Sequence, residues 1–118
     1  MNISKTKGSV HKTFEAFYFD EQGTLCTEAV DVWIKRISLR KAAAEEFQKI
    51  FQDIEKNFER ISTFICDLVE KWSLTIDDEG TPLEINKENI LDLDIDLATK
   101  ISEAIAEVVF PNFTKAKN

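Results

Sequence analysis

Length, composition and charge restrict what this protein can be. Its 118 residues give room for one domain with one core. It carries 22 acidic and 15 basic residues, a net charge of −7, so most of its surface repels nucleic acid and anionic membranes. The apolar fraction of 43%, with nine Phe and two Trp, suffices for a packed core and argues against disorder.

We therefore expect mostly regular structure, with helix dominant and proteins as partners. The alternative is that the acidic surface serves solubility alone. The sequence contains neither a signal-peptide core nor a run of eighteen apolar residues, so we expect a soluble, intracellular protein without a membrane partner.

The N-terminal third predicts an arm followed by a hairpin. Residues 1–12 show no hydrophobic periodicity, and we expect a flexible arm. Its four scattered bases make a nucleic-acid-binding arm the alternative. Alternating apolar and polar residues then predict two strands joined by a turn at Asp20–Gly23. The result is a β-hairpin over residues 13–37, which must pack on a helix or join a larger sheet to be stable.

The middle of the chain predicts one long amphipathic helix over residues 39–72, with Ser38 as its N-cap. This stretch contains no Gly or Pro, and its apolar residues recur every 3.5 positions. A continuous helix of this length spans about 50 Å, whereas a domain of this size has a radius of gyration of only ~13–14 Å. Either the helix is kinked, with Asn57 as the candidate position, or another subunit covers part of its apolar stripe.

Two interpretations of the apolar stripe are open: it packs on the core of its own domain, or it binds a partner or a second copy of the chain. The residues of this candidate partner-binding face are Phe47, Phe51, Ile54, Phe58, Ile61 and Phe64. If the face is intramolecular core, Phe58→Ala should lower the free energy of unfolding by about 3–5 kcal/mol. A loss below ~1 kcal/mol would indicate an interaction surface.

The C-terminal third predicts a turn and helices that fold back. Trp72 ends the long helix and is the candidate hinge and core anchor. Residues 73–110 begin with an acidic turn, after which Asn86 caps a short helix and Asp96 caps a longer one. The fold class is therefore α+β and mainly helical, with an N-terminal β-hairpin, one long amphipathic helix, straight or kinked, and C-terminal helices folding back on it. We expect residues 13–110 to form a single globular domain, and residues 111–118 a flexible tail.

No residue pattern predicts a chemical site. Asp92, Asp94 and Asp96 alternate as in a calcium-binding EF-hand loop, but Leu97 replaces the glycine that such a loop requires, and the apolar residues between the acids look like core anchors. The only histidine, His11, falls in the expected arm, and neither cysteine has an activating partner. We therefore expect no catalytic residue, no metal ligand and no cofactor.

A series of short motifs begins at the end of the long helix. Trp72 is followed by the acidic Asp-Asp-Glu-Gly turn, by Thr81-Pro82-Leu83, by the helix start Asn86-Lys87-Glu88-Asn89-Ile90 and by the segment Leu91–Leu97. These motifs, which lie mainly within residues 60–110, resemble the tail assembly chaperones of long-tailed bacteriophages.

The resemblance implies a small, mainly helical, non-enzymatic assembly factor in the host cytoplasm that is absent from the mature virion. It implies that the partners are the tape-measure protein and the tail-tube protein, and a homo-oligomer remains open. The Phe-rich face would shield a helical client by helix-in-groove packing. The alternatives are a structural tail-completion or head–tail joining protein, and a small intracellular protein–protein interaction module.

Overall fold

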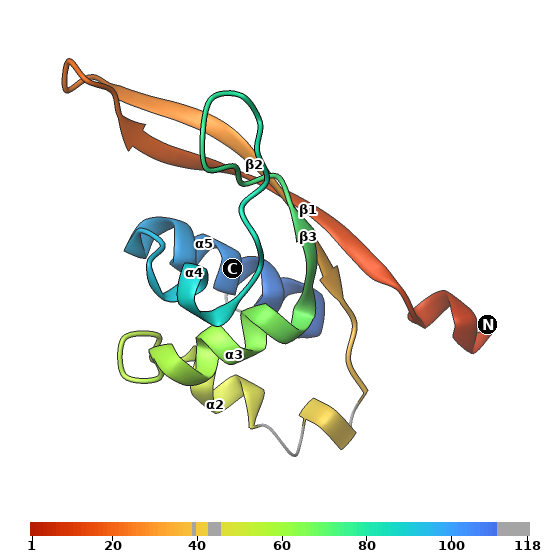
Figure 1. Ribbon diagram of the computed structural model, residues 1–118. Helices are drawn as coiled ribbons and strands as arrows, with labels where there is room; N and C mark the ends of the chain where they lie inside the picture. The colour runs from red at the N-terminus through yellow and green to blue at the C-terminus, as the bar shows by residue number, and fades with distance from the viewer. Residues whose placement is uncertain (39, 43–45, 111–118) are drawn as a thin grey trace.

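The computed structural model describes residues 1–38, 40–42 and 46–110 (Figure 1). The fold is α+β: a three-stranded antiparallel sheet of order β1-β2-β3 has the helices packed on one of its faces. The elements are η1 (Ile3–Thr6), β1 (Ser9–Phe19), β2 (Leu25–Lys35), α2 (Phe47–Phe51), α3 (Phe58–Leu68), β3 (Val69–Trp72), α4 (Lys87–Leu91) and α5 (Ile95–Val109). None of the described helices combines the length and the apolar character needed to cross a membrane.

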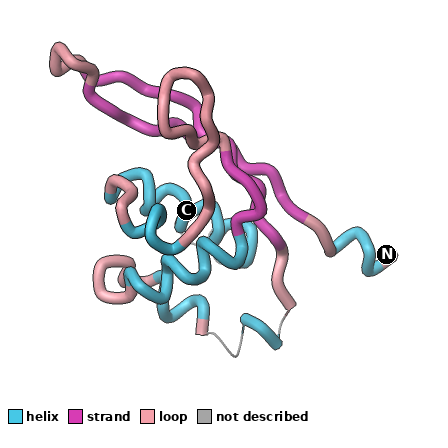
Figure 2. The backbone as a smooth tube through the Cα atoms, viewed as in Figure 1, coloured by secondary structure: helices cyan, strands magenta, loops and turns pink. Residues whose placement is uncertain are grey.

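The hairpin is longer than the sequence predicts. Strand β1 pairs with β2 in a continuous register from Ser9↔Lys35 to Phe19↔Leu25, so residues 9–12, which we expected in the arm, belong to the sheet. Asp20 forms the turn because its carboxylate accepts hydrogen bonds from the backbone of two turn residues. The turn end of the hairpin reaches beyond the helical layer (Figure 2).

The core lies between the sheet and the helices. Alternation along β2 turns Val32 and Ile34 inward, where both are fully buried. They join the buried aliphatic residues of α3 and α5, which repeat at helical spacing. The core residues at or below 2% exposure are Val32, Ile34, Ile65, Leu68, Ile101 and Ile105.

The expectation of a mainly helical fold with one long helix over residues 39–72 is wrong. Helical content is 38% against 27% strand, and the described residues 46–72 of this segment contain α2, α3 and the strand β3 in place of one helix. Glu46 directly precedes α2 and has a φ of 53°, a left-handed conformation that a continuous right-handed helix does not contain. The non-helical residues 52–57 separate α2 from α3, and α3 ends at Leu68 instead of Trp72.

Local polar contacts explain the second break. The Asp53 carboxylate accepts a hydrogen bond from the Lys56 backbone at 3.2 Å, and the Asn57 amide donates to the Asp53 carbonyl at 2.9 Å. Such side-chain bonds compete with the helical ladder. The break lets α2 fold against α3, so that Phe51 meets Phe64 with ring centroids 5.9 Å apart.

A tertiary contact explains why the end of the expected helix is a strand. Val69 and Trp72 pair with Ile34 and Val32 of β2 and complete the sheet. Val69 is 3% exposed in this position. Burial against the sheet outweighs the weak helical preference of a β-branched or aromatic residue.

The C-terminal third follows the sequence prediction more closely. Asn86 caps α4 by accepting a hydrogen bond from the Asn89 backbone at 2.8 Å, which confirms the predicted cap. The last helix is capped by Asp94 and not by Asp96, because the Asp94 carboxylate accepts from the Asp96 backbone. The expected tail, residues 111–118, lies outside the described residues.

Candidate functional site

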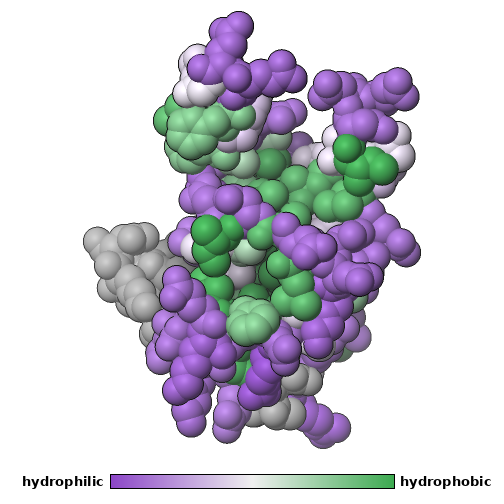
Figure 3. Space-filling view, turned by 60° about the vertical axis from the view of Figure 1, so that its left-hand side comes forward, coloured by the Kyte–Doolittle hydropathy of each residue, from purple (hydrophilic) through white to green (hydrophobic). Residues whose placement is uncertain are grey.

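An apolar groove opens between α3, α4 and α5 and encloses a cavity of about 120 Å³. Figure 3 faces this side of the molecule and shows apolar side chains gathered in a hollow rimmed by hydrophilic ones. The lining residues are Ile54, Glu55, Phe58, Ile61, Ser62, Ile65, Ile90, Leu91, Leu93, Ile95, Ala98 and Ser102.

The floor of the groove is part of the core. Ile61 and Ile65 from α3 and Ile90 from α4 are at most 4% exposed. The two serines of the lining are satisfied inside their own helices: Ser62 Oγ donates to the Glu59 carbonyl at 2.6 Å, and Ser102 Oγ donates to the Ala98 carbonyl at 2.8 Å. The floor therefore presents an apolar surface without a polar group in need of a ligand.

Three large apolar side chains stand at the groove and are exposed: Phe58 at 54%, Leu91 at 42% and Ile95 at 59%. They come from three elements, and side-chain caps fix the start of the two helices that carry Leu91 and Ile95. Asn86 holds α4, which ends with Leu91, and Asp94 holds the first turn of α5, where Ile95 begins the helix. An exposed apolar cluster over a preformed hollow is typical of a protein-binding site.

Acidic residues lie in the groove and next to its exposed apolar residues of α4 and α5. Its lining includes Glu55 and no basic residue. Asp92 follows Leu91 directly, and Asp94 and Asp96 flank Ile95. A partner that reaches these apolar residues therefore meets carboxylates beside them.

The candidate partner-binding face predicted from the sequence does not form one surface. Phe51 and Phe64 pack on each other, and Phe64 is 3% exposed, so both belong to the interior packing. Ile54, Phe58 and Ile61 line the groove. Phe47 begins α2, and its side chain lies outside what the structure describes.

The predicted anchor, Trp72, is half-buried at the end of β3. Its indole Nε1 donates to the Leu83 carbonyl at 2.7 Å, which ties the loop after β3 back to the sheet. Within that loop, the Thr81 backbone and hydroxyl bond to Asp77 and, with other backbone N–H groups, hold the pKa of its carboxyl below the ordinary value. Trp72 thus fixes a loop and does not end a helix.

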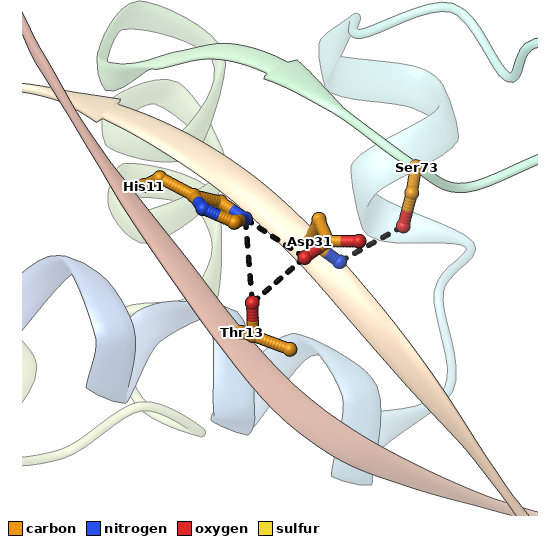
Figure 4. Close-up of polar contacts among 4 residues, drawn as sticks. All are labelled: His11, Thr13, Asp31 and Ser73. Atoms are coloured by element: carbon orange, nitrogen blue, oxygen red, sulfur yellow. Dashed lines mark hydrogen bonds and ion pairs between the residues drawn. The ribbon is translucent and has the colours of Figure 1, made fainter.

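Sequence reasoning missed a polar cluster on the outer sheet face, because we expected His11 in the arm. His11, Thr13 and Asp31 converge there (Figure 4). The Thr13 hydroxyl donates to Asp31 Oδ1 at 2.7 Å, and His11 Nε2 donates to the same oxygen at 2.8 Å. These two bonds, that of Thr13 foremost, hold the pKa of Asp31 below its ordinary value. Ser73 accepts from the Asp31 backbone and links β3 to β2.

The geometry of this cluster differs from that of a nucleophile–base–acid relay. In such a relay the acid and the hydroxyl contact opposite nitrogens of the imidazole. Here both face His11 Nε2, and the Thr13 proton goes to Asp31. The other contact of the imidazole ring is stacking on Trp33, with centroids 4.5 Å apart. The cluster therefore fastens β1 to β2.

Metal-binding geometry is also absent from the part of the chain that the structure describes, where no three His, Cys, Asp or Glu side chains are grouped to hold an ion. Sequence reasoning missed Leu91 and Ile95 as groove residues. The groove depends on a tertiary fold that brings α4 and the start of α5 beside α3.

No family model matches this chain, and neither a curated protein nor a solved structure shows significant similarity to it.

Proposed function

We propose that the protein is a non-enzymatic protein-binding module whose apolar groove takes an amphipathic helix. The observation that carries this proposal is the exposure of Phe58, Leu91 and Ile95 around a hollow whose two serines are already hydrogen-bonded inside their own helices. Large apolar side chains on the partner fill such a groove, and the surrounding polar residues set its orientation.

The charge of the groove indicates the chemistry of the helix. Glu55 lines the groove, and Asp92 and Asp94 lie at its α4–α5 end without a basic residue in the lining. A helix with Lys or Arg beside its apolar stripe is attracted to these carboxylates, and an acidic helix is repelled. We therefore propose a basic amphipathic helix as the ligand.

The resemblance to phage tail assembly chaperones makes the tape-measure protein the proposed client and tail-tube assembly in the host cytoplasm the proposed process. A long helical client with apolar stripes is the kind of ligand that a groove of this shape takes. Deleting the gene from its phage should abolish tails and leave heads intact. Mass spectrometry of virions purified from the unmodified phage should find no stoichiometric copies of this protein. Abundant copies would favour a structural tail component.

The groove itself is tested with a helical peptide that carries Leu at i, i+3, i+4 and i+7 and Lys at the remaining positions. Ile95→Asp should weaken its binding by about tenfold or more, because a charge replaces an exposed anchor. Ile76→Asp is the matched control, since Ile76 is 63% exposed and does not line the groove. Isothermal titration calorimetry measures both. Equal loss in the two variants, or tighter binding of the same peptide with Glu in place of Lys, would contradict the proposal.

A further inference from the structure

The outer edge of β1 offers unpaired backbone groups. The sheet order leaves β1 at an edge, paired on one side with β2. The β1–β2 register places odd-numbered residues of β1 opposite odd-numbered residues of β2, and Asp31 of β2 bonds through its backbone to Ser73 on the far side. In an antiparallel sheet the backbone groups of one residue point to the same side. The N–H and C=O groups of Thr13, Glu15 and Phe17 therefore point outward.

One hydrogen bond to this edge is recorded among the described residues, and it comes from a cation. Lys100 of α5 donates from Nζ to the Glu15 carbonyl at 2.6 Å. The same Nζ lies 4.1 Å from the centroid of the Phe17 ring. The edge thus already binds an ammonium group through a backbone carbonyl and an aromatic face.

A cleft of about 260 Å³ runs between this edge and α5. Its lysines are already paired: Lys12 lies 2.9 Å from Glu107, and Lys100 lies 3.3 Å from Asp96. Glu15 and Glu103 also line the cleft, and neither forms an ion pair within the described part of the chain. The carboxylates that remain for a ligand make the cleft acidic.

The hairpin extends this character toward its turn. Residues 13–34 contain five acidic residues and no Lys or Arg. Phe17 is 50% exposed and Phe19 is 71% exposed. Two of the devices that usually prevent strand addition are missing from β1, which contains no Pro and no bulge. The edge has charge, exposed aromatic surface and outward backbone groups together, and of these groups the Glu15 carbonyl already accepts from Lys100.

We propose that the edge of β1 from Thr13 to Phe19 binds an extended, basic segment of a partner protein by strand addition. The partner's backbone bonds to the outward N–H and C=O groups of β1. On the outer face of the sheet its alternate side chains meet Glu15, Phe17 and Phe19, so a Lys or Arg two positions from an apolar residue fits this edge. This surface is separate from the groove and does not depend on the proposed groove ligand.

Charge decides between a basic partner and a second copy of the chain. Pairing two β1 edges would bring together two hairpins whose charged residues over 13–34 are all acidic. Like charges on neighbouring strands destabilise such pairing. A basic segment gains from the same charges.

The test uses an acetylated and amidated peptide of about seven residues that carries Lys and Val in turn at every second position, with Thr at the positions between them, a length that covers Thr13–Phe19. NMR titration of the full chain should shift the amide resonances of residues 13, 15, 17 and 19 most. N-methylation of the peptide at alternate residues on the hydrogen-bonding edge should weaken binding by about tenfold, because several backbone bonds are lost. N-methylation of the opposite edge is the matched control and should leave binding unchanged.

Two variants separate this site from the groove. Glu15→Lys should weaken binding of the peptide about tenfold or more by reversing the charge beside it, whereas Ile95→Asp in the groove should leave it within about twofold. Equal binding of both N-methylated peptides, or an effect of Ile95→Asp that matches Glu15→Lys, would overturn the proposal. A concentration-dependent dimer in sedimentation, dissociated by the peptide, would identify a second copy as the occupant and would also overturn it.

Discussion

Asp31 concentrates the polar contacts of the outer sheet face on one side chain. Its carboxylate accepts from Thr13 and His11, and its backbone N–H donates to Ser73. The two side-chain bonds favour the charged form, which is why the pKa of Asp31 lies below its ordinary value. A carboxyl with a lowered pKa in the folded state stabilises the fold above the unfolded pKa of about 3.9, and this contribution is lost as the pH falls through the folded pKa.

A substitution at Thr13 tests this account. Thr13→Val removes the largest cause of the shift and keeps the β-branched shape, so the pKa of Asp31 should rise toward its ordinary value. The acid limb of the stability curve should then move to higher pH. NMR titration of the Asp31 carboxyl carbon measures the pKa directly. Thr27→Val on β2 is the control, and a shift of equal size there would show that the hydroxyl of Thr13 is not the cause.

At the scale of elements, α3 has two different faces. Phe64 lies on the face toward the core and is 3% exposed, whereas Phe58 stands at the groove and is 54% exposed. The periodicity of the sequence could not separate the two, because both residues fall on or beside the same stripe.

Alanine substitution distinguishes these faces. Phe64→Ala should lower the free energy of unfolding by about 3–5 kcal/mol, the usual cost of removing a buried aromatic ring. Phe58→Ala should lower it by only about 1 kcal/mol, because half of its surface is already in water. This replaces the larger cost that core packing of Phe58 would imply. Urea denaturation of both variants measures the difference, and equal losses would mean that Phe58 is as well packed as Phe64.

The parts of the fold that could be predicted are those set by local chemistry. Alternation predicted the hairpin, and the side chain of Asn86 predicted the start of α4. The prediction of one long helix was wrong because apolar residues three and four positions apart do not show where a helix stops. The same spacing runs through α2, α3 and into β3. Local periodicity also cannot show that Val69 and Trp72 meet the open side of β2, because that pairing joins segments far apart in the chain.

The candidate site was predicted in part for the same reason. Ile54, Phe58 and Ile61 stood out by their place in the stripe, and the structure puts them in the groove. Ile95 lies between Asp94 and Asp96, and this alternation indicated a core anchor, whereas Leu91 was expected only as the end of a short helix. Only the tertiary arrangement of α4 and α5 beside α3 shows that these two residues are exposed.

At the scale of the whole molecule, one core joins the sheet to the helices. Val32 and Ile34 of β2 share a buried cluster with Ile65 of α3 and Ile101 of α5. Neither layer keeps its apolar face covered without the other, so we expect them to unfold together.

The positions of the two tryptophans make this testable. Trp33 lies in β2 and Trp72 in β3, so tryptophan fluorescence reports on the sheet. Circular dichroism at the helical band reports mainly on α3 and α5, the two longest helices. The two urea transitions should have the same midpoint and slope. Loss of the fluorescence signal before the helical signal would show that the sheet unfolds separately.

Helix α5 is a structural part of both proposed binding surfaces. Ala98 and Ser102 line the groove, whereas Lys100 and Glu103 line the cleft beside β1. Any displacement of α5 by one ligand alters the surface presented to the other, and thermodynamic linkage makes that influence equal in both directions. A helical ligand and an extended one would then regulate each other's affinity through a rigid element of fifteen residues.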